Sequence, residues 1–420
     1  MAADLTASPA TVRPQAPAAD AEPTTNEGLP QRSRVSSPIA VTMIGTLPPW
    51  RGVAPYTHLL LQALESVGGL EIEFIDFTSL YPPRLYPGGD PVDRGAARPM
   101  FRRASVRRLL AWYNPLSWLW AGLTLRGSVV HAQWWSYVLA PVYLFVLALA
   151  RLRGKRVLLT LHNVSPHDAS GWRRWLYRSV FHLAHHFIVH AQRNADVLAT
   201  VHPRAAGRIT VVPLGLHSVA AREDLTREEA RQRLALPSDR PVILAFGNIR
   251  PYKGLDVLLP AFRLVLDAGV EAALAIVGQP WEDFRRYERI IGRLELGPHV
   301  HTRLGYAPDE EVEAFFSAAD VAVLPYTDFD AQSGAGTLAL SFGLPLIVSD
   351  VGGLPELVDD SRAVVPPNSP AALAEAIRAV LTDEAFRARL AAGSRRRASE
   401  LDWRQIARRT TDVYRLLAAP

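Results

Sequence analysis

The sequence contains no cysteine and no apolar run long enough to cross a membrane. The absence of cysteine excludes disulfides, cysteine-ligated metals and thiol chemistry, and it is in keeping with a reducing cytoplasm. The longest apolar run, residues 137–150, has 14 residues and includes Pro141, whereas a bilayer-spanning helix needs about 20. We therefore expect a cytoplasmic protein without a membrane span.

The first 37 residues lack an apolar segment altogether. They are rich in Ala, Pro, Thr and Ser, so they hold no cleavable signal and are expected to form a disordered tail. The rest of the chain is longer than one hydrophobic core usually supports, and two domains are expected.

Charge is nearly balanced, with a net value of +5, yet arginines cluster in the first half of the chain. We interpret three of these clusters as parts of helices: Arg102, Arg103, Arg107 and Arg108; Arg151, Arg153, Lys155 and Arg156; Arg173 and Arg174. A basic face of this kind would suit anionic lipid headgroups or a lipid diphosphate, and plain solvation of the arginines is the alternative. No nucleic-acid-binding module accompanies the charge, so nucleic acid is not expected as a partner.

Aromatic residues crowd the same part of the chain, at Trp112, Tyr113, Trp118, Trp120, Trp134 and Trp135. With the neighbouring arginines they predict peripheral contact of the N-terminal domain with the inner face of the cell membrane. Burial in the core of that domain is the competing interpretation.

Short apolar segments alternate with helical patterns along the chain. Strands are predicted at residues 39–45, 70–77, 128–132, 156–161, 185–190 and 208–213, and this alternation predicts a parallel, doubly wound sheet. The pattern restarts after a capping-box signature at residues 225–229, with further strands at 241–246, 272–278, 299–304, 321–325 and 346–349. We therefore expect two Rossmann-like α/β domains whose parallel sheets face an interdomain cleft, where ligands bind in folds of this class.

Two loops at predicted strand ends carry chemistry in the first half. The turn around Gly52 would let the backbone approach a sugar or phosphate, although a plain strand-to-helix turn explains it too. His162 follows a buried strand and begins the polar segment that reaches His167 and Asp168. A histidine there is a candidate catalytic group, with structural hydrogen bonding as the alternative.

Two more loops lie in the second half. Residues 247–254 place Asn248, Arg250 and Lys253 before a helix, and such cations at a helix N-terminus suit a diphosphate. The backbone amides of Ser333, Gly334 and Ala335 are predicted to cap a phosphate, and Gln332 to bond a sugar hydroxyl.

With these loops in hand, residues 39–418 resemble a retaining glycosyltransferase of family 4 with the GT-B fold. The resemblance rests on residues 247–254, 318–326, 342–350 and 351–356, and on the Gln-Ser-Gly loop, a variant similar to that of bacterial exopolysaccharide and glycoconjugate transferases. It implies an acceptor domain at 38–216, a nucleotide-sugar domain at 217–404, and a helix at 405–420 that packs back on the first domain.

The resemblance also implies residue roles. Lys253 would neutralise the donor diphosphate, with Arg250 in place of the arginine that falls at Asn248 here. His162 would lie near the transferred sugar, and Gly52 near the donor phosphates. The family's Glu-x7-Glu motif departs from its pattern, because Asp330 stands at the first glutamate and Leu338 at the second. Asp330 is a catalytic candidate, whereas Leu338 cannot accept a hydrogen bond from ribose.

The predicted function is transfer of a hexose-like sugar from a nucleoside-diphosphate sugar to an acceptor hydroxyl, with retention of configuration, in bacterial polysaccharide or glycoconjugate synthesis. The nucleotide sugar is a co-substrate and no further cofactor is expected. No metal site is predicted, since Asp328 and Asp330 have metal-site spacing in a different motif context. The acceptor is a saccharide or a lipid-linked saccharide. A non-catalytic sugar-nucleotide or glycan-binding subunit and a GT-B nucleotide-sugar epimerase remain alternatives.

Overall fold

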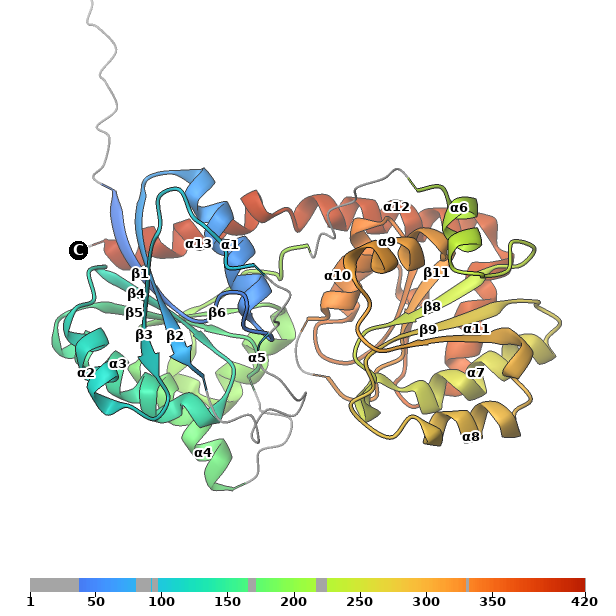
Figure 1. Cartoon of the computed structure of the whole chain (residues 1–420), viewed down its shortest axis with the longest axis horizontal. Coiled ribbons are helices and arrows are strands. Elements are labelled where there is room, and N and C mark those ends of the chain that lie inside the picture. The colour runs from blue at the N-terminus through green and yellow to red at the C-terminus, as the bar shows by residue number, and fades with distance from the viewer. Residues whose placement is uncertain are drawn as a thin grey trace, which may run out of the picture. The chain divides into compact units, whose positions relative to one another are not determined.

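A computed structural model describes residues 38–80, 92, 97–164, 171–216, 225–329 and 332–419. Within these residues, two parallel sheets organise residues 38–419, one of seven strands and one of six. The predicted α/β class is confirmed (Figure 1). The tail and the predicted polar positions His167, Asp168 and Asp330 lie outside the described residues.

The first sheet has the strand order β3-β2-β1-β4-β5-β6-β7, and every neighbouring pair is parallel. Its central strands are buried on both faces, which is why they appear in the sequence as continuous apolar runs. The strand order reverses direction between β1 and β4, so the loops after these strands open at a switch point. The strands are β1 (Ile39–Ile44), β2 (Leu70–Ser79), β3 (Ser105–Ala111), β4 (Val129–Trp134), β5 (Arg156–Leu161), β6 (His186–Val189) and β7 (Ile209–Val211).

Helices cover both faces of this sheet (Figure 1). One face packs against α1 and the C-terminal helix α13, and the other against α2, α3, α4 and α5. Most of the apolar run at residues 137–150 lies in α3, whose residues Val142, Val146 and Leu147 are buried in the core of the second face. The helices are α1 (Ala54–Val67), α2 (Pro115–Leu123), α3 (Ala140–Leu152), α4 (Trp172–Ser179), α5 (Gln192–Val201) and α13 (Trp403–Ala418).

The second sheet has the order β10-β9-β8-β11-β12-β13, again all parallel, with its switch point between β8 and β11. The predicted capping box is confirmed at the start of α6, where Thr226 and Glu229 cap each other's backbone amides. The strands are β8 (Val242–Phe246), β9 (Ala273–Gly278), β10 (Val300–Leu304), β11 (Val321–Leu324), β12 (Leu346–Ser349) and β13 (Val364–Val365). The helices are α6 (Arg227–Arg233), α7 (Leu255–Asp267), α8 (Arg285–Arg293), α9 (Asp309–Ala318), α10 (Gly334–Ser341), α11 (Pro370–Thr382) and α12 (Glu384–Glu400).

The C-terminal helix α13 returns to the first sheet. Its residues Ile406, Val413 and Tyr414 are buried in one cluster with β1 and α1. The start of the helix is closely packed, because a Cβ at Gly215 would lie 2.5 Å from the ring of Trp403, the first residue of α13. The predicted domain boundaries and the interdomain cleft stay predictions.

The helical interpretation of the first arginine cluster is wrong, because Arg107 and Arg108 lie in strand β3. Arg107 donates to Oε1 of Glu73 on β2 at 2.7 Å, and Arg108 lies 3.6 Å from Asp76. These acidic partners explain why a charged segment adds to the edge of the sheet. Arg102 and Arg103 precede the strand, and Arg156 begins β5 instead of extending a helix.

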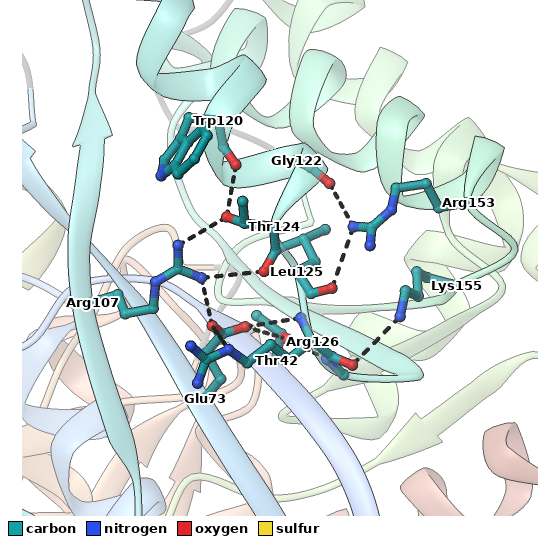
Figure 2. Close-up of polar contacts among 11 residues, drawn as sticks. Thr42, Glu73, Arg107, Trp120, Gly122, Thr124, Leu125, Arg126, Arg153 and Lys155 are labelled. Carbon is teal, nitrogen blue, oxygen red and sulfur yellow. Dashed lines mark hydrogen bonds and ion pairs between the residues drawn. The ribbon is translucent and has the colours of Figure 1, made fainter.

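Figure 2 shows what the remaining basic side chains of this region do. Arg153 donates to the carbonyls of Gly122 at 2.9 Å and Leu125 at 3.3 Å, and Arg107 donates to the carbonyl of Thr124 at 3.2 Å. Cations therefore satisfy the carbonyl end of α2 and fix that helix to the sheet edge.

The six aromatic residues for which membrane contact or core burial was expected differ in their exposure. Trp134 is fully buried against Tyr143 and Tyr177, so its predicted place at a membrane interface is wrong. Trp112, Trp118 and Trp135 are partly buried against the same core. Tyr113 and Trp120 are exposed. No helix among the described residues is long and apolar enough to cross a membrane.

Candidate functional site

The loop after β1 leads into α1 through a glycine in a left-handed conformation. Gly52 has φ +80°, which other residues rarely adopt, and a Cβ there would meet no atom within 4 Å. Helix α1 has no side-chain cap. The backbone at this turn is consequently exposed beside uncapped helix amides, as the predicted approach to a phosphate requires.

His162 lies directly after β5, and its ring is held by neighbours from other strands. Its Nε2 lies 2.9 Å from Oε1 of Gln133 on β4. Its ring meets Tyr56 edge-on at 4.9 Å and lies 5.1 Å from His190, which follows β6. Three neighbouring strand ends and α1 thus surround this histidine.

The hydrogen-bond network assigns the protonation of these rings. The amide nitrogen of Gln133, a donor only, lies 3.2 Å from Nε2 of His131, and Oγ1 of Thr160 lies 2.7 Å from the same ring nitrogen. His131 therefore carries its proton on Nδ1 and donates to Tyr414 at 2.7 Å. With its oxygen as acceptor, Gln133 fixes the proton of His162 on Nε2 and leaves Nδ1 as a hydrogen-bond acceptor.

Burial keeps the three histidines neutral. It lowers the pKa of His162 well below 6.5, with further lowering by His190 and His131. Burial likewise lowers the pKa of His131 to about 3 and that of His190 to about 4. A neutral His162 is suited to accept a hydrogen bond from a sugar hydroxyl at any pH above the acid range.

The sequence reasoning missed the residues that support His162. His131, Gln133 and His190 lie at or just beyond the ends of predicted strands, a position that marks site residues in parallel sheets. Polar residues inside apolar strand segments were the available signal. Tyr414 is 283 positions from its partner His131, and the sequence carried no signal for that pairing.

In the second domain, the loop after β8 brings Lys253 and Arg250 beside the start of α7. The Arg250 guanidinium stacks 3.6 Å above the Trp281 ring, a contact that holds it in one position. Asn248 is exposed on the same loop. Burial lowers the pKa of Lys253 to about 8, with a further lowering by Arg250.

Lys253 is linked to the N-terminus of α10 through two side chains. Its Nζ donates to the hydroxyl of Tyr326, which lies 2.9 Å from Oγ of Ser333. Ser333 is the N-cap of α10 and accepts from the amide of Gly336 at 3.3 Å. The amides of Gly334 and Ala335 belong to the first turn, whose donors have no acceptor within the helix.

These groups converge over Gly247. A Cβ at this glycine would lie 3.6 Å from Nζ of Lys253 and 3.9 Å from Cβ of Ala335. Gly247 has φ +116°, a conformation that favours glycine. The absence of a side chain there also leaves space between Lys253 and Ala335. An ammonium group and a helix N-terminus therefore border one small space at the switch point of the sheet, which is an arrangement that binds phosphate.

Two residues of the acidic motif region have other contacts. The Oε1 atom of Gln332 accepts from the amide of Leu214 at 2.6 Å, which fixes the side chain, and its amide nitrogen can still donate to a sugar hydroxyl. Leu338 is 6% exposed and packs in the core beneath α10. The position where an acid was expected is thus part of the hydrophobic core.

Two family models match the chain, one for each half. The model "Glycosyltransferase Family 4" matches residues 50–218, and the model "Glycosyl transferases group 1" matches residues 226–397. The chain belongs to the family 4 glycosyltransferases and has the GT-B fold.

Curated relatives agree with this assignment. The D-inositol 3-phosphate glycosyltransferase of Streptomyces avermitilis is 31% identical over 242 residues, which are 55% of this chain and 52% of that protein. The chain thus spans about half the length of this relative. The glycogen synthase of Mycobacterium tuberculosis is 27% identical over 86% of this chain and 90% of its own length.

Solved structures share the fold. Sucrose-phosphate synthase from Thermosynechococcus elongatus has a TM-score of 0.70 and 22% identity, covering 90% of this chain and 99% of that one. Anabaena HepE, solved in complex with UDP and glucose, has a TM-score of 0.66 and 15% identity, covering 90% of this chain and 100% of its own.

Proposed function

We propose that this protein transfers a hexose from a nucleoside-diphosphate sugar to an acceptor hydroxyl, with retention of anomeric configuration. The observation that carries the proposal is the connection from Lys253 through Tyr326 to Ser333, which places a cation and a helix N-terminus around Gly247. The relatives in the inositol phosphate and glycogen synthase groups support the same reaction class.

The hard step is departure of the diphosphate as positive charge develops at the anomeric carbon. Lys253, Arg250 and the amides of Gly334 and Ala335 stabilise the leaving negative charge, and their fixed positions make that stabilisation effective. The bond from the anomeric carbon to the phosphate oxygen breaks. A bond to the acceptor oxygen forms on the same face, and the acceptor proton passes to the leaving diphosphate.

The first domain contributes His162. Because its Nε2 proton points to Gln133, its Nδ1 accepts a hydrogen bond from a hydroxyl of the transferred sugar. Asp330 keeps its proposed place near the sugar, and Gly52 its place near the donor phosphates. The proposal gives no role to a metal or to a cofactor other than the donor.

For the acceptor we propose a saccharide, in lipid-linked form, within bacterial polysaccharide or glycoconjugate synthesis. The support is the exposed aromatic and basic surface of the first domain, which carries Trp120, Trp172 and Trp175. A free saccharide acceptor is the simpler outcome of the same reaction.

Purified protein with labelled UDP-, GDP- and ADP-sugars and a panel of saccharide and lipid-linked acceptors tests the proposal. Transfer product with the donor's anomeric configuration, assigned by NMR, is the expected result. An altered sugar nucleotide without an acceptor would instead indicate an epimerase. Donor binding without transfer or hydrolysis would indicate a binding subunit, and no donor binding by calorimetry would remove the proposal.

The chain has two lysines, Lys155 and Lys253, which supplies a matched control. Lys253→Ala should raise the donor KM and lower kcat together. Lys155→Ala, which removes only a contact to the Arg126 carbonyl, should leave both unchanged.

A further inference from the structure

Helix α2 exposes its apolar side. Leu116, Trp120 and Leu123 follow one another at helical spacing and are 74%, 60% and 50% exposed. Amphipathic helices of globular proteins normally bury this stripe. Here the opposite side is buried: Ala121 is covered, and a Cβ at Gly122 would lie 2.7 Å from Leu149 of α3.

Two neighbouring helices also expose large apolar residues. Phe145 and Leu152 are exposed on α3, and Trp172 and Trp175 on α4, the last two at 66% and 71%. The three helices lie on the same side of the seven-stranded sheet, where their inner residues share one core (Figure 1). We call the exposed residues Leu116, Trp120, Leu123, Phe145, Leu152, Trp172 and Trp175 the aromatic face. Exposed apolar residues gathered on adjacent helices are typical of interaction sites.

The cations beneath α2 do not belong to this face, because they have structural partners. Arg153 and Arg107 bind the carbonyl end of α2, and Lys155 donates to the carbonyl of Arg126 at 3.4 Å (Figure 2). These contacts fix α2 on its inner side, and its apolar stripe faces outward, uncovered by any helix or strand that the structure describes.

A basic hollow adjoins the aromatic face at Trp175. It lies between α4, η3 (Val180–Leu183) and η4 (Pro203–Ala205). Its lining includes Arg174, Trp175, Arg178, His182, His202 and Arg204, and none of the lining residues that the structure describes is acidic. Within the described residues, the buried Nε of Arg178 has no hydrogen-bond partner. The surrounding cations and His182, added to burial, lower the pKa of His202, as expected where the local field is positive.

We propose that the aromatic face and the adjoining basic hollow bind the surface of an anionic phospholipid bilayer. Tryptophan and leucine side chains enter the boundary between headgroups and acyl chains, and Arg178 and Arg204 of the hollow hold a headgroup phosphate. An anionic bilayer supplies both groups that the two parts of this surface would bind, namely phosphates for the arginines of the hollow and an apolar layer for the tryptophans and leucines. This inference goes beyond sugar transfer, and bilayer binding needs no donor.

The full chain is mixed with sucrose-loaded vesicles of phosphatidylcholine, either alone or with roughly one third to one half phosphatidylglycerol. Bound protein is measured by sedimentation at low and at physiological salt. We expect binding to anionic vesicles, a blue shift of tryptophan fluorescence, and little binding to neutral ones. Trp120→Ser with Trp175→Ser should reduce binding at least about tenfold. Arg178→Gln with Arg204→Gln, two changes in the lining of the hollow, should reduce it roughly tenfold on anionic vesicles alone.

Matched controls lie in the second domain. Leu264→Ser removes an exposed apolar residue of α7, and Arg285→Gln with Arg289→Gln removes two exposed cations of α8. These variants should bind like the wild type. The proposal is overturned by absence of vesicle binding, by equal loss in the control variants, or by a dimer in sedimentation equilibrium that Trp120→Ser abolishes. Sugar transfer is assayed separately with a soluble acceptor, so failure of one idea does not imply failure of the other.

Discussion

Nε2 of His162 and Oε1 of Gln133 lie 2.9 Å apart, and this contact sets which nitrogen of the imidazole faces a substrate. The amide of Gln133 also reaches His131, which continues to Tyr414 on α13. The candidate catalytic histidine thus depends on a buried line of side chains from β4, β5 and the C-terminal helix.

Gln133→Leu should lower kcat while leaving the donor KM nearly unchanged. Without the amide oxygen, the His162 ring loses its preferred tautomer and orientation, and misplacement of about 1 Å can cost roughly a hundredfold in rate. Steady-state kinetics of transfer measure the effect. Gln232→Leu, on the exposed side of α6, is the control. An unchanged kcat in Gln133→Leu would show that the contact is structural only.

Donor affinity should fall as pH rises above about 8. Burial lowers the pKa of Lys253 to about 8, so the ammonium is present at neutral pH and is lost as pH rises through that value. Binding of a diphosphate favours the charged form, so above pH 8 affinity should fall by up to tenfold per unit, equivalent to about 1.4 kcal/mol. Isothermal titration calorimetry between pH 6.5 and 9.5, roughly the range in which this group changes charge, measures it.

The same group can be observed directly, because the chain has two lysines. Reductive methylation with labelled formaldehyde gives each lysine its own NMR signal, and Lys155→Ala assigns the pair. A Lys253 signal that titrates near the ordinary value of 10.5 would contradict the pH prediction.

Restoring an acid at Leu338 should destabilise the protein instead of improving donor binding. The side chain is 6% exposed within an apolar core, and an unpaired buried carboxylate costs several kcal/mol. Leu338→Ala should cost about 2–5 kcal/mol in the free energy of unfolding, whereas Leu338→Met should cost less than about 1.5. Urea unfolding measures all three variants. A stable Leu338→Glu protein with tighter donor binding would refute this account.

The histidine cluster should make the protein less stable in mild acid. The folded-state pKa values of His131 and His190 are lowered to about 3 and about 4, so below pH 6.5 the unfolded chain takes up protons that the folded chain does not. Each histidine then contributes a loss of about 1.4 kcal/mol per pH unit. Asp76, whose pKa burial raises to about 7, acts in the opposite direction.

A difference measurement isolates the histidine contribution. His190→Gln retains a donor for the Val212 carbonyl but has no proton to gain. Between pH 6 and 5, approximately, its free energy of unfolding should fall less steeply than that of the wild type by about 1.4 kcal/mol per unit. Equal slopes would mean that His190 is protonated in the folded chain.

The sequence was sufficient for the elements whose pattern is local. Continuous apolar strands such as β5 and β9, the capping box at Thr226 and the glycine turns before α1 and α7 all correspond to the structure. Strand β3 was not predicted, because its arginines resemble those of a solvated helix. Only the structure shows that Glu73 on β2 lies beside Arg107. The neighbouring strand β2 determines that this segment is extended, and the local sequence pattern carries no information about that neighbour.

The candidate site divides in the same way. Lys253, Ser333 and His162 follow strands and were identified from that position, whereas Tyr326 and Gln133 act through partners brought together by the sheet. Leu338 shows the opposite case, because the family motif suggested a lost ligand contact and burial shows a core position. Asp330 lies outside the described residues, and its role stays a prediction.

The bond between His131 and Tyr414 has a consequence for synthesis of the chain. A ribosome makes the first domain's strands long before residue 414, so a nascent chain holds His131 without its phenol partner and without the apolar cover of α13. The floor beneath His162 is complete only when almost the entire polypeptide has emerged. A first domain that folds during synthesis would therefore lack part of the support for the candidate site until α13 is made.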